Sequence, residues 1–287
     1  MHRRQAVLTL LLTLAARAAD FSGASALEFA RKAVAFGPRP PGTPAIANLR
    51  AFIKAELRKT GATLVDDRFT APTPTGPVAM ENVVARFPGT SGRRIVITGH
   101  YDTKPQPGFV GANDGGSSTG FLLEFARALS GAKRKDDVFL VFFDGEEAFR
   151  AWTATDSLYG SRHLAARWAA EGALPAIKAL INVDMIGDRD LSILNEYNSN
   201  AWLRKTIWSA AASLGLSRHF QNDPSYIEDD HMPFVKAGVP AADLIDFDYG
   251  PGNRYWHTND DTIDKLAAPS FEVVGRVLLE TVRRLEQ

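Results

Sequence analysis

Short apolar runs alternate with amphipathic segments along most of this chain of 287 residues. Four runs are rich in β-branched and aromatic residues and are too short for buried helices, which predicts buried strands. These runs are residues 94–99, 137–143, 176–183 and 239–245. Two less apolar segments, 63–70 and 82–87, also have the composition of strands.

Seven other segments place apolar residues three and four positions apart, which predicts amphipathic helices. In the second of them, Leu49, Phe52 and Leu57 fall on one face. The expected helices are residues 26–36, 45–60, 117–129, 158–170, 201–214, a short one at 232–237, and 270–285.

Strands and helices therefore alternate through most of the sequence. This order predicts an α/β three-layer sandwich with a largely parallel central β-sheet and helices on both faces. No internal repeat or low-complexity linker divides the chain, so we expect residues 19–287 to form a single domain.

The first residues have the pattern of a signal peptide. Arg3 and Arg4 precede the apolar run 6–16, which is too short to span a bilayer comfortably, and small residues follow, ending at Ala18. We expect residues 1–18 to be cleaved after Ala18, leaving a secreted or periplasmic chain without a membrane span. An amphipathic first helix or a retained anchor is the alternative.

Composition narrows this picture in two ways. Cysteine is absent, which excludes disulfides, thiol chemistry and a lipoprotein anchor, and favours a bacterial periplasm over an animal secretory pathway. The 33 basic and 33 acidic residues balance, and no basic stripe or tail is present, so we expect no nucleic-acid partner.

Ligand-type side chains gather where the expected strands end. In open α/β sheets, sites form outside the carboxyl ends of the strands. The residues at or just after such ends are His100, Asp102, Asp114, Glu146, Glu147, Asp184 and His257. Their convergence from separate segments indicates one site rather than isolated structural residues, whereas His163 and His219 lack such neighbours and are expected to be structural.

The imidazole and carboxylate chemistry of this set fits a catalytic zinc site with an open coordination position. Asp114, Glu147 and His257 complete three protein ligands. His100 and Asp184 could add a second metal, with Asp114 as the bridge, and Asp102 is placed to orient the ring of His100.

Glu146 and Glu147 come shortly after the buried run 137–143, and adjacent residues there point in different directions. One can bind metal while the other faces the substrate as a general base or acid. A pair of solvated glutamates at the start of a helix is the structural alternative.

The residues at these strand ends resemble motifs of the zinc aminopeptidases, peptidase family M28, which use two co-catalytic metals. The matching stretches are Gly99-His100-Tyr101-Asp102, Gly111-Ala112-Asn113-Asp114-Gly115-Gly116, Glu146-Glu147, Val183-Asp184-Met185-Ile186-Gly187 and His257-Thr258. The resemblance runs from about residue 37 to the end and implies a mixed, mostly parallel sheet between helices.

Within that superfamily the chain is more similar to the animal-type glutaminyl-peptide cyclotransferases. The similarity is carried by residues 142–165, 229–234 and 238–240, and by Trp256 directly before His257. Aminopeptidases usually have serine at position 229 and commonly tyrosine at position 256. The run after residue 112 departs toward the aminopeptidase form, which bacterial cyclases share, and the cysteine pair of the animal secreted enzymes is absent.

This resemblance implies a role for each site residue. It assigns zinc binding to Asp114, Glu147 and His257, acid/base catalysis to Glu146, a carboxylate hydrogen-bond network with that base to Asp184 and Asp229, and the pocket walls to Trp152 and Trp256. Asp229 could instead cap the helix that follows it.

The implied reaction converts an amino-terminal glutamine of a peptide or protein to pyroglutamate and releases ammonia. Zinc would polarise the γ-carbonyl, and Glu146 would move the proton from the α-amine to the leaving nitrogen. Asp184 and Asp229 are expected to raise the proton affinity of Glu146 through like-charge repulsion. One zinc ion is expected. Two remain possible, because His100 and Asp184 could bind a second ion.

Two other functions remain open at this stage. In a secreted di-zinc aminopeptidase, Glu146 would deprotonate a water that cuts the first peptide bond. A non-catalytic binding domain of the same fold is the second alternative, against which the intact ligand set argues. We expect a monomer.

Overall fold

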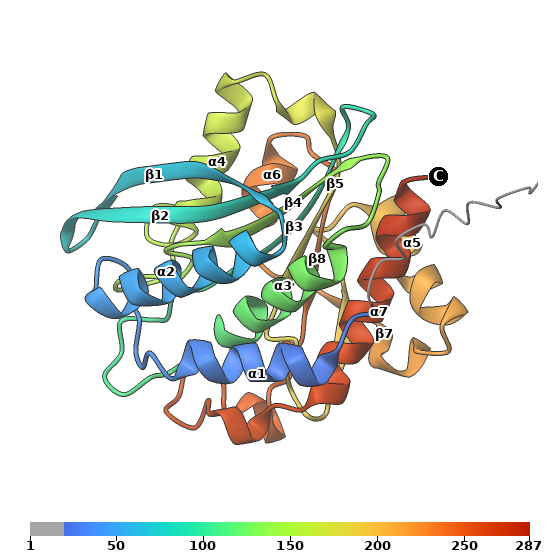
Figure 1. Cartoon of the computed structure of the whole chain (residues 1–287). Helices are drawn as coiled ribbons and strands as arrows, with labels where there is room; N and C mark the ends of the chain where they lie inside the picture. Colours follow the sequence, from blue (N-terminus) through green and yellow to red (C-terminus); the bar gives the residue numbers. More distant parts are fainter. Residues whose placement is uncertain (1–19) are drawn as a thin grey trace, which may run out of the picture.

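A twisted six-stranded sheet forms the centre of the computed structural model, which describes residues 20–287 (Figure 1). The strand order is β1-β2-β4-β3-β5-β8. β1 and β2 form an antiparallel hairpin, and β2 is also antiparallel to β4. The remaining neighbours, β4, β3, β5 and β8, are parallel. The expected signal peptide lies outside the described residues.

The elements have the following bounds. The strands of the main sheet are β1 (Thr63–Thr73), β2 (Gly76–Phe87), β3 (Arg94–His100), β4 (Asp137–Phe143), β5 (Ile177–Asp184) and β8 (Ala241–Ile245). A separate parallel pair consists of β6 (Ile193–Glu196) and β7 (Phe220–Ser225). The α-helices are α1 (Gly23–Val34), α2 (Pro44–Lys59), α3 (Gly116–Leu129), α4 (Tyr159–Ala170), α5 (Ala201–Ser213), α6 (Met232–Lys236) and α7 (Ala268–Leu285).

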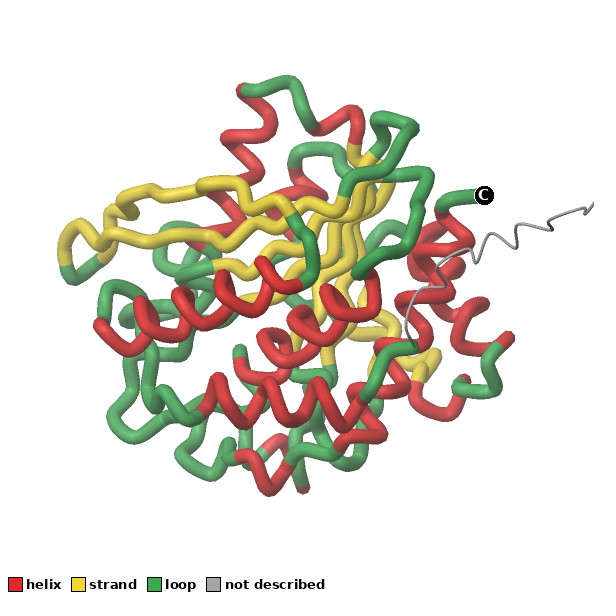
Figure 2. The backbone as a smooth tube through the Cα atoms, in the orientation of Figure 1, coloured by secondary structure: helices red, strands yellow, loops and turns green. Residues whose placement is uncertain are grey.

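Alternating side chains of the central strands fill two cores, one on each face of the sheet. On β3, Ile95 and Ile97 belong to the core shared with α1, α2, α3, α5 and α7, whereas Val96 belongs to the core shared with α4 and α6. Figure 2 shows the strands running between these helices. The expected three-layer α/β sandwich is therefore confirmed.

Two parts of the fold differ from the sequence-based expectation. The hairpin is longer than predicted, because β1 and β2 remain paired from Thr63 opposite Arg86 to Thr73 opposite Gly76. Its outer half is largely solvated, so backbone pairing extends it without an apolar pattern. The pair β6–β7 was not predicted, since both strands are short and β7 contains Pro224.

The parallel strands bring the candidate residues to one edge of the sheet. β3 ends at His100, β5 ends at Asp184, and β4 ends three residues before Glu146. Carboxyl ends of neighbouring parallel strands lie side by side, which is where sites form in such sheets. Within residues 20–287, no helix is both long and apolar enough to cross a membrane.

Candidate active site

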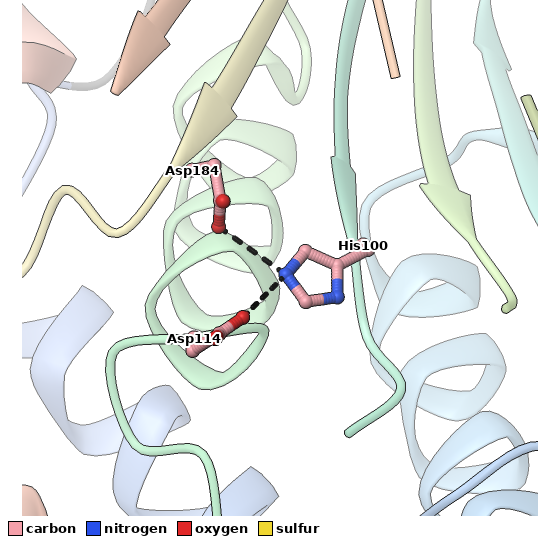
Figure 3. A group of neighbouring side chains, drawn as sticks. All are labelled: His100, Asp114 and Asp184. Carbon is pink, nitrogen blue, oxygen red and sulfur yellow. Dashed lines mark hydrogen bonds and ion pairs between the residues drawn. The ribbon is translucent and has the colours of Figure 1, made fainter. Parts of the chain in front are cut away.

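His100 lies between two carboxylates at the carboxyl edge of the sheet (Figure 3). Its Nε2 is 3.1 Å from Asp114 Oδ1 and 3.2 Å from Asp184 Oδ1. The three side chains are buried, and burial raises the pKa of Asp184 although His100 opposes this rise. These are the three residues predicted from the sequence for a possible second metal.

A second trio shares Asp114. Its other oxygen, Oδ2, lies 3.2 Å from His257 Nε2, which is 3.1 Å from Glu147 Oε1. Both carboxylate oxygens are buried and accept no well-oriented hydrogen bond within residues 20–287. Burial alone would lower the pKa of His257, but the two carboxylates raise it to about 9. A negatively charged pocket of nitrogen and oxygen donors with orphaned oxygens fits a zinc ion.

The loop that carries Asp114 is held by two residues that the sequence did not single out. Asp261 is buried and accepts from the backbone N–H of Asn113 at 2.8 Å and of Asp114 at 3.1 Å. Arg39 is fully buried and donates to the carbonyls of Tyr101 at 3.0 Å and Gly111 at 2.8 Å. Neither residue stands out in the sequence, because the sequence pattern does not distinguish a buried arginine or aspartate from one on the surface.

Gly115, directly after Asp114, is required by the backbone. Its φ is +85°, and a Cβ there would lie 2.4 Å from the carbonyl oxygen of Asp102. No other residue can therefore make the turn that brings Asp114 beside His100 before α3 begins.

Asp102 fixes both glutamates as well as His100. Its Oδ1 lies 3.3 Å from His100 Nδ1, as expected, and also accepts from the backbone N–H of Glu146 at 3.1 Å. Its Oδ2 accepts from the N–H of Glu147 at 3.3 Å. The two glutamate side chains then diverge, because Glu147 faces His257 while Glu146 lines a pocket.

That pocket has a volume of about 540 Å³ and opens beside the two trios. Its carboxylates are Asp114, Glu146, Asp184, Glu228 and Asp229, and its aromatic walls are Trp152, Tyr226, Phe247 and Trp256. Trp256 stacks on His257 with ring centroids 4.2 Å apart and also contacts Phe247 at 4.8 Å. Trp152 is 40% exposed at the mouth. Both tryptophans therefore lie where the resemblance implied.

Glu146 holds its proton unusually tightly. Burial is the largest cause of a pKa well above the ordinary glutamate value, and the charges of Glu147, Asp229 and Asp230 add to it, while His100 opposes it. The expectation that Asp229 contributes agrees with these charges. Asp184, which was expected to contribute as well, is not among the main charges.

Asp229 is buried, and its pKa is raised to about 6, first by burial and then by the charge of Asp184. It accepts from Asn182 Nδ2 at 2.9 Å and from the backbone N–H of Asp230. Neither of these hydrogen bonds involves Glu146. Within the described residues, Asp229 therefore acts on the base through its charge and not through a direct hydrogen bond.

The two histidines expected to be structural lie away from this edge. His163 on α4 stacks on Phe69 with ring centroids 4.2 Å apart and lies 3.1 Å from Asp67. His219 contacts the carbonyl of Leu191 at 3.1 Å. Neither lines the pocket.

Residues 82–282 match the model of peptidase family M28. The glutaminyl-peptide cyclotransferase-like protein of Bos taurus is 34% identical over 271 residues, covering 84% of this chain and 70% of that protein. The glutaminyl-peptide cyclotransferase of Drosophila melanogaster is 33% identical over 84% of this chain and 76% of its own length.

Solved structures agree with these relatives. The crystal structure of an Acidobacteriales bacterium glutaminyl cyclase is 40% identical, with a TM-score of 0.90 over 100% of this chain and 99% of that one. A Zn-dependent exopeptidase from Parabacteroides distasonis is 26% identical, with a TM-score of 0.82 over 92% and 99%. The chain therefore belongs to peptidase family M28 and, within it, to the glutaminyl-peptide cyclotransferases.

Proposed function

We propose that this protein is a zinc-dependent glutaminyl-peptide cyclotransferase that converts the amino-terminal glutamine of peptides or proteins to pyroglutamate. The observation that carries the proposal is the position of Glu146. This buried carboxyl group, with its raised pKa, lines an aromatic pocket directly beside a complete ligand trio. A proton carrier, a metal site and a cavity for one side chain thus meet at one edge of the sheet.

The proposed zinc ligands are Asp114, Glu147 and His257. One ion is proposed, because the orphaned oxygens belong to this trio, whereas Asp184 Oδ1 in the other trio already accepts from the backbone N–H of Met185 at 2.8 Å and lies 3.2 Å from His100 Nε2. When bound, zinc supplies a Lewis acid that polarises the γ-carbonyl of the terminal glutamine.

Glu146 carries the proton in the proposed mechanism. Its carboxylate accepts a proton from the α-amine, the amine nitrogen forms a bond to the γ-carbonyl carbon, and the bond from that carbon to the amide nitrogen breaks. Glu146 returns the proton to the departing nitrogen, which leaves as ammonia. Because burial raises its pKa above the ordinary glutamate value, Glu146 is a stronger base than a solvated carboxylate and is suited to taking and returning this proton.

The remaining pocket residues position the substrate and limit water. Asp102 accepts a hydrogen bond from the backbone N–H of Glu146, which fixes the backbone position from which the side chain of the base extends. Trp256 and Phe247 form an aromatic wall that would keep the glutamine side chain folded back on its own amine. Asp184 and Asp229 line the same pocket, and their negative charge would stabilise the positive charge that develops on the amine nitrogen as it attacks.

One observation favours a second candidate, a di-zinc aminopeptidase. His100, Asp114 and Asp184 form another trio with ligand atoms within 4.8 Å of one another. With two ions bound, Glu146 would act on water, and the first peptide bond would be cut instead.

A pair of peptides separates the two activities. We expect a Gln-initiated peptide to lose the mass of one ammonia, while a Leu-initiated peptide stays intact. Release of free leucine would refute the cyclase assignment. Glu146→Gln should abolish turnover while zinc content, measured by elemental analysis, stays that of the unsubstituted protein, and substantial remaining turnover would overturn the role of Glu146.

Export and oligomeric state are further proposals. We propose cleavage after Ala18, which would retain Phe21, a buried residue that contacts Phe121 at 5.1 Å between ring centroids. The exported protein would act as a monomer in the periplasm or outside the cell. Mass spectrometry of the amino terminus and light scattering test these two statements.

A further inference from the structure

Two exposed tyrosines extend the active-site pocket beyond its mouth. Tyr226 lines the pocket and is nevertheless 70% exposed, and Tyr197 beside it is 48% exposed, with ring centroids 5.8 Å apart. We call this pair the tyrosine ledge. The terminal-glutamine chemistry described above uses neither residue. Large exposed aromatic side chains next to a pocket are typical of surfaces that bind a ligand or a protein partner.

The ledge rests on a rigid base. Tyr197 follows β6 and Tyr226 follows β7, and the N–H of Tyr197 donates to the carbonyl of Ser225 at 2.9 Å. The next residue on the β7 side, Ile227, donates its N–H to the buried carboxylate of Glu196 at 3.2 Å. The backbone under both rings is therefore fixed before any ligand arrives.

Arg204 on α5 holds Tyr197, the ring of the ledge that does not line the pocket. Its guanidinium lies over the ring of Tyr197, 4.2 Å from the centroid, and donates to Asn195 Oδ1 at 2.6 Å. A cation over one face fixes the ring and leaves Tyr226 as the freer surface toward the pocket mouth. Pre-ordered aromatic rings lose little conformational freedom when a ligand packs on them.

We propose that the tyrosine ledge binds the side chain of the second residue of the substrate peptide and favours an aromatic or large apolar residue there. This proposal rests on the proposed function, since it deepens the substrate class of the same site. Tyr226 and Ile227 also line the pocket, so the ledge adjoins the space proposed for the terminal glutamine and can be reached by the residue that follows it. Its rings offer aromatic contact, which matches an aromatic partner.

The test compares two peptide amides, Gln-Phe-Ala and Gln-Ala-Ala, on the zinc-loaded enzyme. We expect kcat/KM to be about three- to tenfold higher for Gln-Phe-Ala, the size of one aromatic contact. In Tyr226→Ala the ratio should fall toward one, mostly through KM, because the ledge lies outside the reacting atoms. Tyr226→Phe should keep the ratio, since the ring and not the hydroxyl makes the contact.

Val65→Ala provides the matched control for loss of an exposed apolar side chain. Val65 is 36% exposed on β1, at the opposite edge of the sheet from β8, and its substitution should leave the ratio unchanged. A wild-type ratio of one, or an unchanged ratio in Tyr226→Ala, overturns the ledge alone. If neither peptide is cyclised, the proposed function fails first and the ledge falls with it.

Discussion

Asp102→Asn tests whether one buried carboxylate holds the catalytic loop together. The substitution keeps the shape of the side chain but replaces one acceptor oxygen by an amide donor. Either orientation of the amide leaves the N–H of Glu146 or of Glu147 facing another donor. The loop between β4 and α4 therefore loses a buried hydrogen bond to a charged acceptor.

The magnitude follows from burial. Asp102 is fully buried, so an N–H that loses this acceptor stays unpaired at a cost of about 1–3 kcal/mol. Part of this loss is offset, because the charge of Asp102 contributes, after burial, to raising the pKa of Asp144 to about 7. We expect a net loss of about 1–2 kcal/mol in the free energy of unfolding, which corresponds to a fall in Tm of about 2–4 °C for a chain of this size.

Activity should fall more than stability suggests. A carboxyl group displaced by about 1 Å costs on the order of a hundredfold in rate, and Glu146 depends on Asp102 for its backbone position. Thermal unfolding and kcat with a Gln-initiated peptide measure the two effects.

Asp137→Asn is the matched control for Asp102→Asn. Asp137 accepts from the N–H of Gly89 at 2.7 Å at the start of β4, the far end of the strand from Glu146. It should lower Tm without lowering kcat at a temperature where the protein is folded. If Asp102→Asn retains both Tm and kcat, the assigned role is wrong, and if only Tm falls, Asp102 supports the fold and not the base.

Two further predictions address the supports of the site. Asp261→Asn should weaken zinc binding about ten- to a hundredfold, because Asp261 orients the loop of Asp114 without being a proposed ligand itself. Competition with a chromophoric chelator measures the zinc affinity, and an unchanged affinity contradicts this role of Asp261. Burial would raise the pKa of Glu196, but the ring of His231, 3.4 Å away, and hydrogen bonds from Ser199 lower it to about 2. The contribution of Glu196 to stability is therefore present above the unfolded value near 4.5 and is lost as the pH falls toward 2. The stability difference between the wild type and Glu196→Gln in pH-dependent denaturant titrations should therefore shrink over that range, and a difference that is independent of pH would show that Glu196 acts through packing alone.

Much of the fold was readable from local pattern. The runs that became β3, β4 and β5 were predicted within one residue at each end, because buried parallel strands are apolar throughout. The outer half of the β1–β2 hairpin and the pair β6–β7 were not predicted. Their residues are held by backbone pairing with a partner strand and bury little apolar surface, so their composition carries no signal.

The sequence by itself determined which residues could meet. Ligand-type side chains stand directly after apolar runs, and the order of strands and helices requires those ends to lie along one edge. His100, Asp114 and Asp184 could be named together for this reason, before any distance was known.

Only the tertiary structure decided how these residues are held and what surrounds them. Arg39 and Asp261 act through backbone groups 62 and 148 positions away, and nothing in their own neighbourhood marks them. The tyrosine ledge likewise exists only because β6 and β7 pair across a helix. The local sequence pattern indicates burial and periodicity. Contacts between distant segments form only when the layers pack against each other. These contacts raise the pKa of Glu146 and bring together the residues that line the pocket.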